Sequence, residues 1–200
     1  ILIIDPELKV QQVLAQKLAL IGYQTVLASS GKDAFSKFTK ENTDLVILDI
    51  LLPTIDGYSL CKKFRQTSQV PIIILTAASS LSDRIMGFEV GADDYVIKPF
   101  FQKELEARIK SILRRTNKNL VKTPKKRQEN LPIHDLFVEA ETRTISRHKS
   151  KFKLTELEYS LLELLIRNSG KELSRKTILE NVWGYTPERS IDTRIVDVHI

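Results

Sequence analysis

Five short apolar runs recur through residues 1–115 and limit the folds that this part of the chain can adopt. Amphipathic stretches with helical spacing lie between the runs, as at Val10, Leu14 and Leu18. Short runs of branched apolar residues are typical of strands buried on both faces, and strands that alternate with helices favour a parallel sheet with right-handed crossovers. The sequence therefore predicts an α/β domain. Its strands are expected at 1–4, 25–28, 45–48, 72–75 and 95–97.

An unusual set of residues stands directly after four of these runs. Asp5 follows the first run, Asp49 the third, Thr76 the fourth and Lys98 the fifth. The carboxyl ends of parallel strands gather at one edge of a sheet, so we expect these side chains to share one crevice. Carboxylates that bind Mg²⁺, with a hydroxyl and an ammonium for phosphoryl oxygens, suit phosphoryl transfer to an aspartate. Each residue taken alone is also compatible with an ordinary turn.

The composition limits the remaining classes. No apolar run approaches the ~20 residues that a membrane span needs, so no membrane partner is expected. The single cysteine, Cys61, excludes an internal disulfide. Residues 116–130 carry five basic residues against one acidic residue and few apolar ones, which predicts a flexible basic linker. Such a basic segment makes nucleic acid a candidate partner, although a merely solvated linker has the same composition.

The second half has a different pattern. Residues 131–153 contain short strand-like segments between turn residues, which predict an antiparallel meander. Thr155 and Glu158 form a capping-box pattern ahead of an apolar-faced helix that Gly170 is expected to stop, and Ser174 is expected to cap the next helix. A third segment is expected from about residue 193 onward. Three short helices behind a small sheet, without a catalytic set, predict a binding domain over 131–200.

Residues 1–115 resemble the receiver domain of two-component response regulators. The resemblance rests on Ile4-Asp5, Asp49 with Pro53 and Asp56-Gly57, Thr76-Ala77, Gly91-Ala92-Asp93-Asp94-Tyr95 and Lys98-Pro99-Phe100. It implies a flavodoxin-like sheet of strand order 2-1-3-4-5 and a phosphoryl group that Asp49 accepts from a sensor histidine kinase. It also implies that Lys98 pairs with the phosphoaspartate and that the peptide bond from Lys98 to Pro99 is cis. Thr76 is expected to follow the phosphoryl group, and Tyr95 is expected to turn inward behind Thr76.

The resemblance further implies a Mg²⁺ site made of Asp5, Asp49 and the backbone carbonyl of Leu51. The family has two adjacent acids after its first strand, whereas this chain has Pro6 at the second position, followed by Glu7. Proline offers no carboxylate, and Glu7 is expected to point away along the next helix. We therefore expect Mg²⁺ binding and phosphorylation to be weakened. One alternative is a phosphorylation-impaired pseudo-receiver that dimerises and binds DNA constitutively.

Charged residues between 84 and 110 match positions through which OmpR/PhoB-type receivers form symmetric pairs. The resemblance implies a homodimer with ion pairs between subunits, joining Arg84 to Glu104, Asp94 to Arg108 and Glu89 to Lys110. The alternative is a plain solvated surface, because exposed ion pairs contribute little singly.

Residues 131–200 resemble the winged-helix domain of the OmpR/PhoB family, on motifs that include Leu154-Thr155, Val182-Trp183-Gly184 and residues 194–200. In that family the third helix enters the major groove of double-stranded DNA. Arg194 and Val198 match DNA-facing positions, Trp183 matches one near a phosphate, and His199 is a further candidate contact. A core tryptophan and a plain helix-face histidine are the alternatives for the last two.

The two resemblances together predict a DNA-binding response regulator that regulates transcription and is not an enzyme, with RNA polymerase as a further candidate partner. An aspartate-nucleophile phosphohydrolase is the less favoured alternative, because it needs an additional acid/base and a substrate cap. Residues 56–61 and 104–109 are most similar to regulators of cyanobacteria and algal plastids. The expected location is therefore the plastid stroma, with the bacterial cytoplasm as the alternative.

The sequence stops at Ile200, where the family continues with basic residues and a β-hairpin wing, so we expect it to be truncated inside the recognition helix. These 200 residues alone are expected to bind DNA weakly. The family's arginines lie in the turn after the position of Ile200, and such phosphate-binding residues supply much of the affinity for DNA. A mobility-shift titration with promoter DNA measures this, and normal promoter affinity would contradict the expectation.

Overall fold

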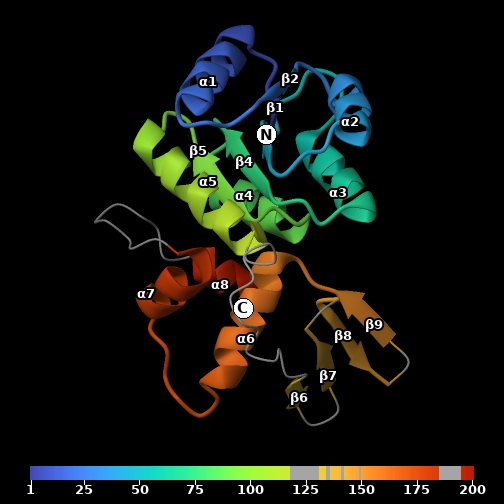
Figure 1. The fold of residues 1–200 in the computed structure, drawn as a ribbon, viewed down its shortest axis with the longest axis vertical. Coiled ribbons are helices and arrows are strands. Elements are labelled where there is room, and N and C mark those ends of the chain that lie inside the picture. The colour runs from blue at the N-terminus through green and yellow to red at the C-terminus, as the bar shows by residue number, and fades with distance from the viewer. Residues whose placement is uncertain (118–130, 134–135, 141, 149, 185–194) are drawn as a thin grey trace. The chain divides into compact units, whose positions relative to one another are not determined.

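The computed structural model describes residues 1–117, 131–133, 136–140, 142–148, 150–184 and 195–200 (Figure 1). The chain divides into two compact units, residues 1–110 and 111–200. The division falls inside a helix, and residues 118–130 lie outside the described part of the chain. The domain boundary at residue 115 and the flexible linker over 116–130 therefore stay predictions.

The first unit is built on a five-stranded parallel sheet of order β2-β1-β3-β4-β5, which confirms the predicted α/β fold and strand order. The strands are β1 (Leu2–Ile4), β2 (Val26–Ala28), β3 (Val46–Leu48), β4 (Ile72–Thr76) and β5 (Asp94–Ile97). Every residue of β1, β3 and β4 is buried, as expected when helices cover both faces of a parallel sheet. Figure 1 shows α1 and α5 on one side of the sheet and α2 and α3 on the other.

Side-chain caps start three of the helices that connect these strands. Ser30 caps α2, Asp56 caps α3 by accepting hydrogen bonds from Tyr58 N and Ser59 N, and Ser80 caps α4. Each cap satisfies backbone N–H groups that have no partner within the helix, so it fixes where the preceding loop ends. The helices are α1 (Leu8–Leu20), α2 (Gly31–Lys40), α3 (Gly57–Thr67), α4 (Leu81–Glu89) and α5 (Gln102–Asn117).

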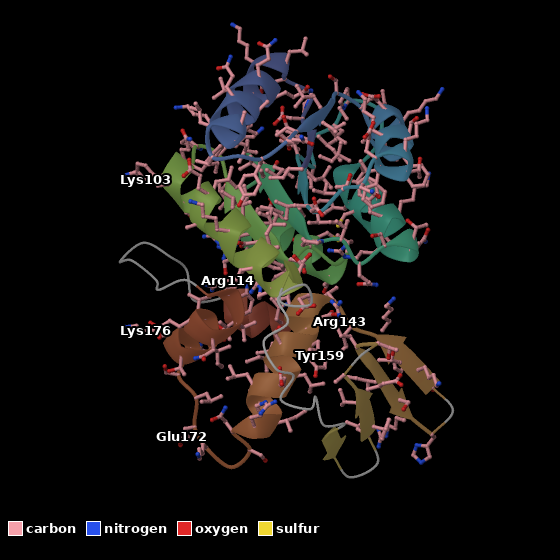
Figure 2. All side chains as sticks on the ribbon, in the orientation of Figure 1. Lys103, Arg114, Arg143, Tyr159, Glu172 and Lys176 are labelled. Atoms are coloured by element: carbon pink, nitrogen blue, oxygen red, sulfur yellow. The ribbon has the colours of Figure 1, made fainter. Side chains whose placement is uncertain are left out.

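The second unit contains a small antiparallel sheet of order β6-β7-β8-β9, which confirms the predicted meander. The strands are β6 (Leu131–Ile133), β7 (Leu136–Glu139), β8 (Thr144–Arg147) and β9 (Ser150–Lys153). Tyr159 packs with Val138 and Ala140 in a small apolar cluster between this sheet and the following helix (Figure 2).

The described helices of the second unit are α6 (Glu156–Arg167), α7 (Arg175–Ile178) with the π-helical turn η1 (Leu179–Trp183), and α8 (Ile195–His199). The capping box of Thr155 and Glu158 and the cap by Ser174 are both present, as predicted. Helix α6 ends at Arg167, just before Gly170, which has a φ of 80°. Among the described residues, no helix combines the length and apolarity that a membrane crossing requires.

Gly57 is required by a close approach of two backbone segments. A Cβ atom at this position would lie 2.3 Å from the Cα atom of Ile50, in the loop that follows Asp49. The loop cannot yield without losing the hydrogen bond from Gly57 N to the Ile50 carbonyl, 3.1 Å long. The first residue of α3 therefore has to be glycine for the loop to close on itself.

We predict that Gly57→Ala lowers the free energy of unfolding by about 1–3 kcal/mol or more, because the added methyl group meets backbone rather than a movable side chain. Urea denaturation at 25 °C measures the change. Lys62→Ala, at an exposed position of the same helix, is the matched control and should stay within about 0.5 kcal/mol of the parent chain. Equal stability of the two variants would contradict the argument.

Candidate functional site

Four polar residues stand at the carboxyl ends of neighbouring strands. Asp5 follows β1, Asp49 follows β3, Thr76 is the last residue of β4, and Lys98 follows β5. These strands are adjacent in the order β1-β3-β4-β5 and all run parallel. The topology therefore brings residues from widely separated parts of the sequence to one edge of the sheet, where α/β proteins bind ligands.

The ammonium group of Lys98 joins the two acids of this edge. Its Nζ atom lies 2.6 Å from Asp5 Oδ2 and 2.7 Å from Asp49 Oδ2, so one cation bridges two carboxylates. Both acids are nearly inaccessible, with Asp5 2% and Asp49 5% exposed. Buried charges persist where they are paired, and this pairing holds the three side chains in one small pocket. The peptide bond between Lys98 and Pro99 is cis.

Backbone amides orient the second oxygen of each carboxylate. Asp49 Oδ1 accepts a hydrogen bond from Leu51 N at 2.9 Å, and Asp5 Oδ1 accepts one from Glu7 N at 2.9 Å. A buried side chain that sequence reasoning missed supports the Asp5 turn, because Gln11 Nε2 donates to the Asp5 carbonyl at 2.6 Å. Gln11 was missed because a polar residue in an amphipathic helix normally faces solvent.

Burial and pairing act in opposite directions on the titration of the pocket. Burial raises the pKa of Asp5, and the hydrogen bonds from Lys98 and the Glu7 amide offset this only in part. Burial also disfavours the charged Lys98, but its hydrogen bonds to Asp49 and Asp5 outweigh that cost and raise the pKa of the ammonium group. Pairing with the two acids therefore keeps Lys98 charged, whereas burial makes Asp5 easier to protonate than an exposed aspartate.

Thr76 and Tyr95 lie beside this pocket in the sheet. Thr76 is fully buried, and its Oγ1 accepts a hydrogen bond from Ala78 N at 3.4 Å. Tyr95 is buried as well, and its hydroxyl donates to the carbonyl oxygen of Ala78 at 3.0 Å. The backbone N–H of Lys98 donates to the Thr76 carbonyl at 2.8 Å. The hydroxyl of Tyr95 thus holds the loop between β4 and α4, next to the residues that surround Asp49.

The donor set of the pocket fits Mg²⁺ with the few protein ligands that the resemblance implied. Asp5 and Asp49 supply carboxylates, and the carbonyl of Leu51 follows Asp49 by two residues. Pro6 supplies no side-chain oxygen, and Glu7 is exposed. No cluster of three acids, cysteines or histidines suited to a metal exists among the described residues. Mg²⁺ often binds through only one or two carboxylates with water and phosphate oxygens, so two acids still form a workable site.

Of the residues predicted to pair between subunits, some form ion pairs within their own chain and others are exposed. Arg108 Nη1 donates to both carboxylate oxygens of Asp94 in the same chain, at 2.8 Å each, and Arg108 Nη2 lies 2.7 Å from Glu104 Oε1. Asp94 is fully buried and Arg108 is 7% exposed. Glu89 and Lys110 are exposed. The structure therefore shows a pair between Asp94 and Arg108 within one chain, while pairing across subunits stays a prediction, as it does for Arg84.

The predicted DNA contacts are described only in part. Arg194 lies outside the described residues, and for Val198 only the helical backbone of α8 is described. Trp183 is fully buried, with its ring centroid 5.4 Å from that of His199. This burial is what the core alternative for Trp183 expects, and the roles of both residues at DNA stay predictions.

An ion pair that sequence reasoning missed connects two helices of the second unit. Arg175 Nε lies 2.7 Å from Asp197 Oδ1 and so ties the start of α7 to α8. The spacing of the two residues in the sequence gave no signal of this contact. Both side chains are exposed, so the pair contributes little to the stability of the unit.

Known proteins match both halves of the chain. Residues 1–110 match the family described as response regulator receiver domain, and residues 149–200 match transcriptional regulatory protein, C terminal. A probable transcriptional regulator ycf27 of Cyanophora paradoxa is 48% identical over 200 residues, which cover all of this chain and 84% of that protein. The alkaline phosphatase synthesis transcriptional regulatory protein PhoP of Bacillus subtilis is 38% identical, over all of this chain and 84% of its own length.

A solved structure spans both units. The response regulator DrrB, described as a Thermotoga maritima OmpR/PhoB homologue, matches with a TM-score of 0.55 and 28% identity, over 99% of this chain and 84% of that one.

We predict that Asp5→Asn stabilises the chain relative to the parent more strongly at pH 7 than at pH 3.5. The folded protein binds the Asp5 proton more tightly than the unfolded chain does, so the parent loses stability as the pH rises from about 3.9 through the raised pKa. Asparagine does not titrate and escapes this loss. Urea denaturation across this pH range tests it, with the exposed Glu41→Gln as control. A gain from Asp5→Asn that shrinks with rising pH would contradict the assignment.

Proposed function

We propose, for a chain that belongs to the OmpR/PhoB family of response regulators, that Asp49 accepts a phosphoryl group and that the acyl phosphate formed controls how the protein acts on DNA. The chain is a DNA-binding response regulator that regulates transcription, and its partners are DNA and a sensor kinase. The observation that carries the proposal is the Lys98 ammonium between the buried carboxylates of Asp5 and Asp49.

The transfer requires Asp49 as the nucleophile. An oxygen of its carboxylate attacks the phosphorus atom of a phosphohistidine on the kinase, the P–N bond breaks, and the imidazole leaves with the bonding electron pair. Two backbone or side-chain donors already hold Asp49, Leu51 N on Oδ1 and Lys98 Nζ on Oδ2, so its orientation is fixed before the donor arrives. Preorganised donors of this kind stabilise the charge that develops during transfer.

Lys98 and Thr76 then hold the product. The ammonium group is within reach of both acids, so a small movement transfers it from Asp49 Oδ2 to an oxygen of the new phosphoryl group. The hydroxyl of Thr76 donates to a second phosphoryl oxygen, and to reach it Thr76 has to move relative to Ala78 N, from which Oγ1 accepts a 3.4 Å hydrogen bond. Movement of Thr76 changes the surroundings of the buried Tyr95, which makes these two residues the first part of the switch.

Mg²⁺, when bound by Asp5, Asp49 and the Leu51 carbonyl, supplies positive charge that offsets repulsion between the carboxylate and the incoming phosphoryl group. Pro6 stands where the family has a second acid, so Asp5 holds the metal with one protein ligand fewer. Lys98 therefore supplies a larger share of the positive charge near Asp49 than in a receiver with two adjacent acids. The proposed consequence is that phosphorylation of Asp49 needs a higher concentration of Mg²⁺.

The phosphorylated protein acts as a homodimer in this proposal. Exposed Glu89 and Lys110, with Arg84 and Glu104, supply charges of both signs on α4 and α5, which suits a symmetric interface. The same proposal includes contacts between the second unit and promoter DNA, through Arg194, Val198, His199 and Trp183. It also includes a contact with RNA polymerase. The algal relatives named ycf27 support the plastid stroma as the location.

A second candidate function is a pseudo-receiver that dimerises and binds DNA without phosphorylation. Pro6 is the observation that favours it, because it removes one of the few oxygen ligands next to Asp5. The two candidates differ in whether Asp49 can be labelled at physiological Mg²⁺.

We predict that Pro6→Asp raises the Mg²⁺ affinity of the receiver about tenfold or more, because a charge-assisted ligand contributes about 1.5–3 kcal/mol. Mg²⁺ titration followed by nuclear magnetic resonance shifts measures the affinity, and acetyl-phosphate labelling of Asp49 at limiting Mg²⁺ should rise with it.

Two variants control this experiment. Glu7→Gln tests whether the neighbouring acid rescues the site, and it should change neither quantity because Glu7 is exposed. Asp49→Asn should abolish labelling in both backgrounds. Equal Mg²⁺ affinity and equal labelling of the parent chain and Pro6→Asp would remove the argument from Pro6.

A further inference from the structure

Tyr58 connects two helices that flank the phosphoacceptor pocket. It is the second residue of α3, and its hydroxyl lies 3.1 Å from the carbonyl oxygen of Asp83 and 3.5 Å from the Asp83 carboxylate, in the first turn of α4. Ser80 already engages the Asp83 side chain, because Asp83 Oδ2 accepts hydrogen bonds from both Ser80 N and Ser80 Oγ. The Tyr58 hydroxyl therefore holds the start of α4 at a point where the helix is itself rigidly capped.

Tyr95 joins this contact from the sheet. Its hydroxyl donates to the carbonyl oxygen of Ala78, in the loop ahead of α4, at 3.0 Å. Gly87 makes room for the ring, because a Cβ atom there would lie 2.9 Å from the Tyr95 ring. Tyr95 thus holds the loop between β4 and α4 at Ala78, and Tyr58 holds the first turn of α4 at Asp83.

Tyr58 is also attached to the nucleophile by a short, closed loop. The loop leaves β3 at Asp49 and ends at Asp56, whose carboxylate accepts hydrogen bonds from Tyr58 N at 3.3 Å and Ser59 N at 3.0 Å. Gly57 N bonds back to the Ile50 carbonyl, so the loop closes immediately beside Asp49. These hydrogen bonds restrict the loop, so a change in the position or charge of Asp49 is expected to move the start of α3.

We propose that Tyr58 is a positioning residue of the switch, which uses its hydroxyl to couple the state of Asp49 to the first turn of α4. This coupling rests on the proposed function and adds a second route to the one through Thr76 and Tyr95. Phosphorylation then shifts a population of α4 arrangements, because the hydroxyl contact exists in one arrangement and is lost in the other. The consequence reaches the α4 surface that carries Arg84 and Glu89.

The first test is a double-mutant cycle that needs no phosphorylation. Asp49→Asn removes the charge of the nucleophile and Tyr58→Phe removes only the hydroxyl, and each is made alone and together in the full chain. Hydrogen exchange of the amides at residues 81–85 is the readout. We expect the effect of Asp49→Asn on their protection to change by about threefold or more when position 58 is phenylalanine. Equal effects in both backgrounds overturn the proposal.

The second test adds acetyl phosphate and Mg²⁺. We expect Tyr58→Phe to be labelled on Asp49 to the same extent as the parent, while the rise in protection at residues 81–85 falls about fivefold, as expected for one lost hydrogen bond. Tyr23→Phe, at the opposite edge of the sheet before β2, is the matched control and should respond like the parent. An undiminished rise in Tyr58→Phe overturns the proposal.

The outcomes separate this inference from the proposed function. A parent chain that takes no label contradicts phosphorylation of Asp49, and the double-mutant cycle then decides the role of Tyr58 by itself. Circular dichroism checks that each variant folds. If Tyr58→Phe does not fold, exchange in the parent with and without Asp49→Asn decides instead. Joint changes at residues 57–60 and 81–85 support the coupling, and independent changes overturn it.

Discussion

The pairing of Lys98 with Asp5 and Asp49 is the interaction on which the rest of the receiver depends. Two acids that are 2% and 5% exposed would repel each other and lack hydration without a cation between them. The ammonium group, 2.6 Å and 2.7 Å from their oxygens, makes the pocket possible and keeps it poised. An incoming phosphoryl group competes for this same cation, so the interaction that stabilises the resting pocket is also the one that phosphorylation rearranges.

Polar contacts link the pocket to the surface of the receiver on two sides. Asp94 and Arg108 form a buried ion pair that ties β5 to α5, so the segment after Lys98 is held by charge as well as by packing. On the other side, the Tyr58 and Tyr95 hydroxyls hold the start of α4. Hydrogen bonds weaken steeply outside a narrow range of distance and angle, and packed cores change between discrete arrangements, so these contacts suit a switch.

The sequence predicted the parts of this protein that depend on period and position. Runs of branched apolar residues indicated the five strands, and the residues after them, such as Asp5 and Lys98, indicated the pocket, because parallel topology alone brings strand ends together. The contacts of Gln11 and Tyr58 were not predictable in this way. Both depend on the three-dimensional distance between elements, and a glutamine or tyrosine on an amphipathic helix has no pattern that separates a buried polar role from a surface one. The same reason explains why Arg108, assigned to a subunit interface, also pairs within its own chain.

Direct identification of the modified residue tests the central claim, which is that this pocket prepares Asp49 as a phosphoacceptor. The full chain is treated with acetyl phosphate and Mg²⁺, the acyl phosphate is reduced with borohydride, and peptides are sequenced by mass spectrometry. We predict homoserine at position 49, and none there when Lys98 is replaced by methionine. Modification at another residue, or labelling of Asp49 that does not depend on Lys98, would contradict it.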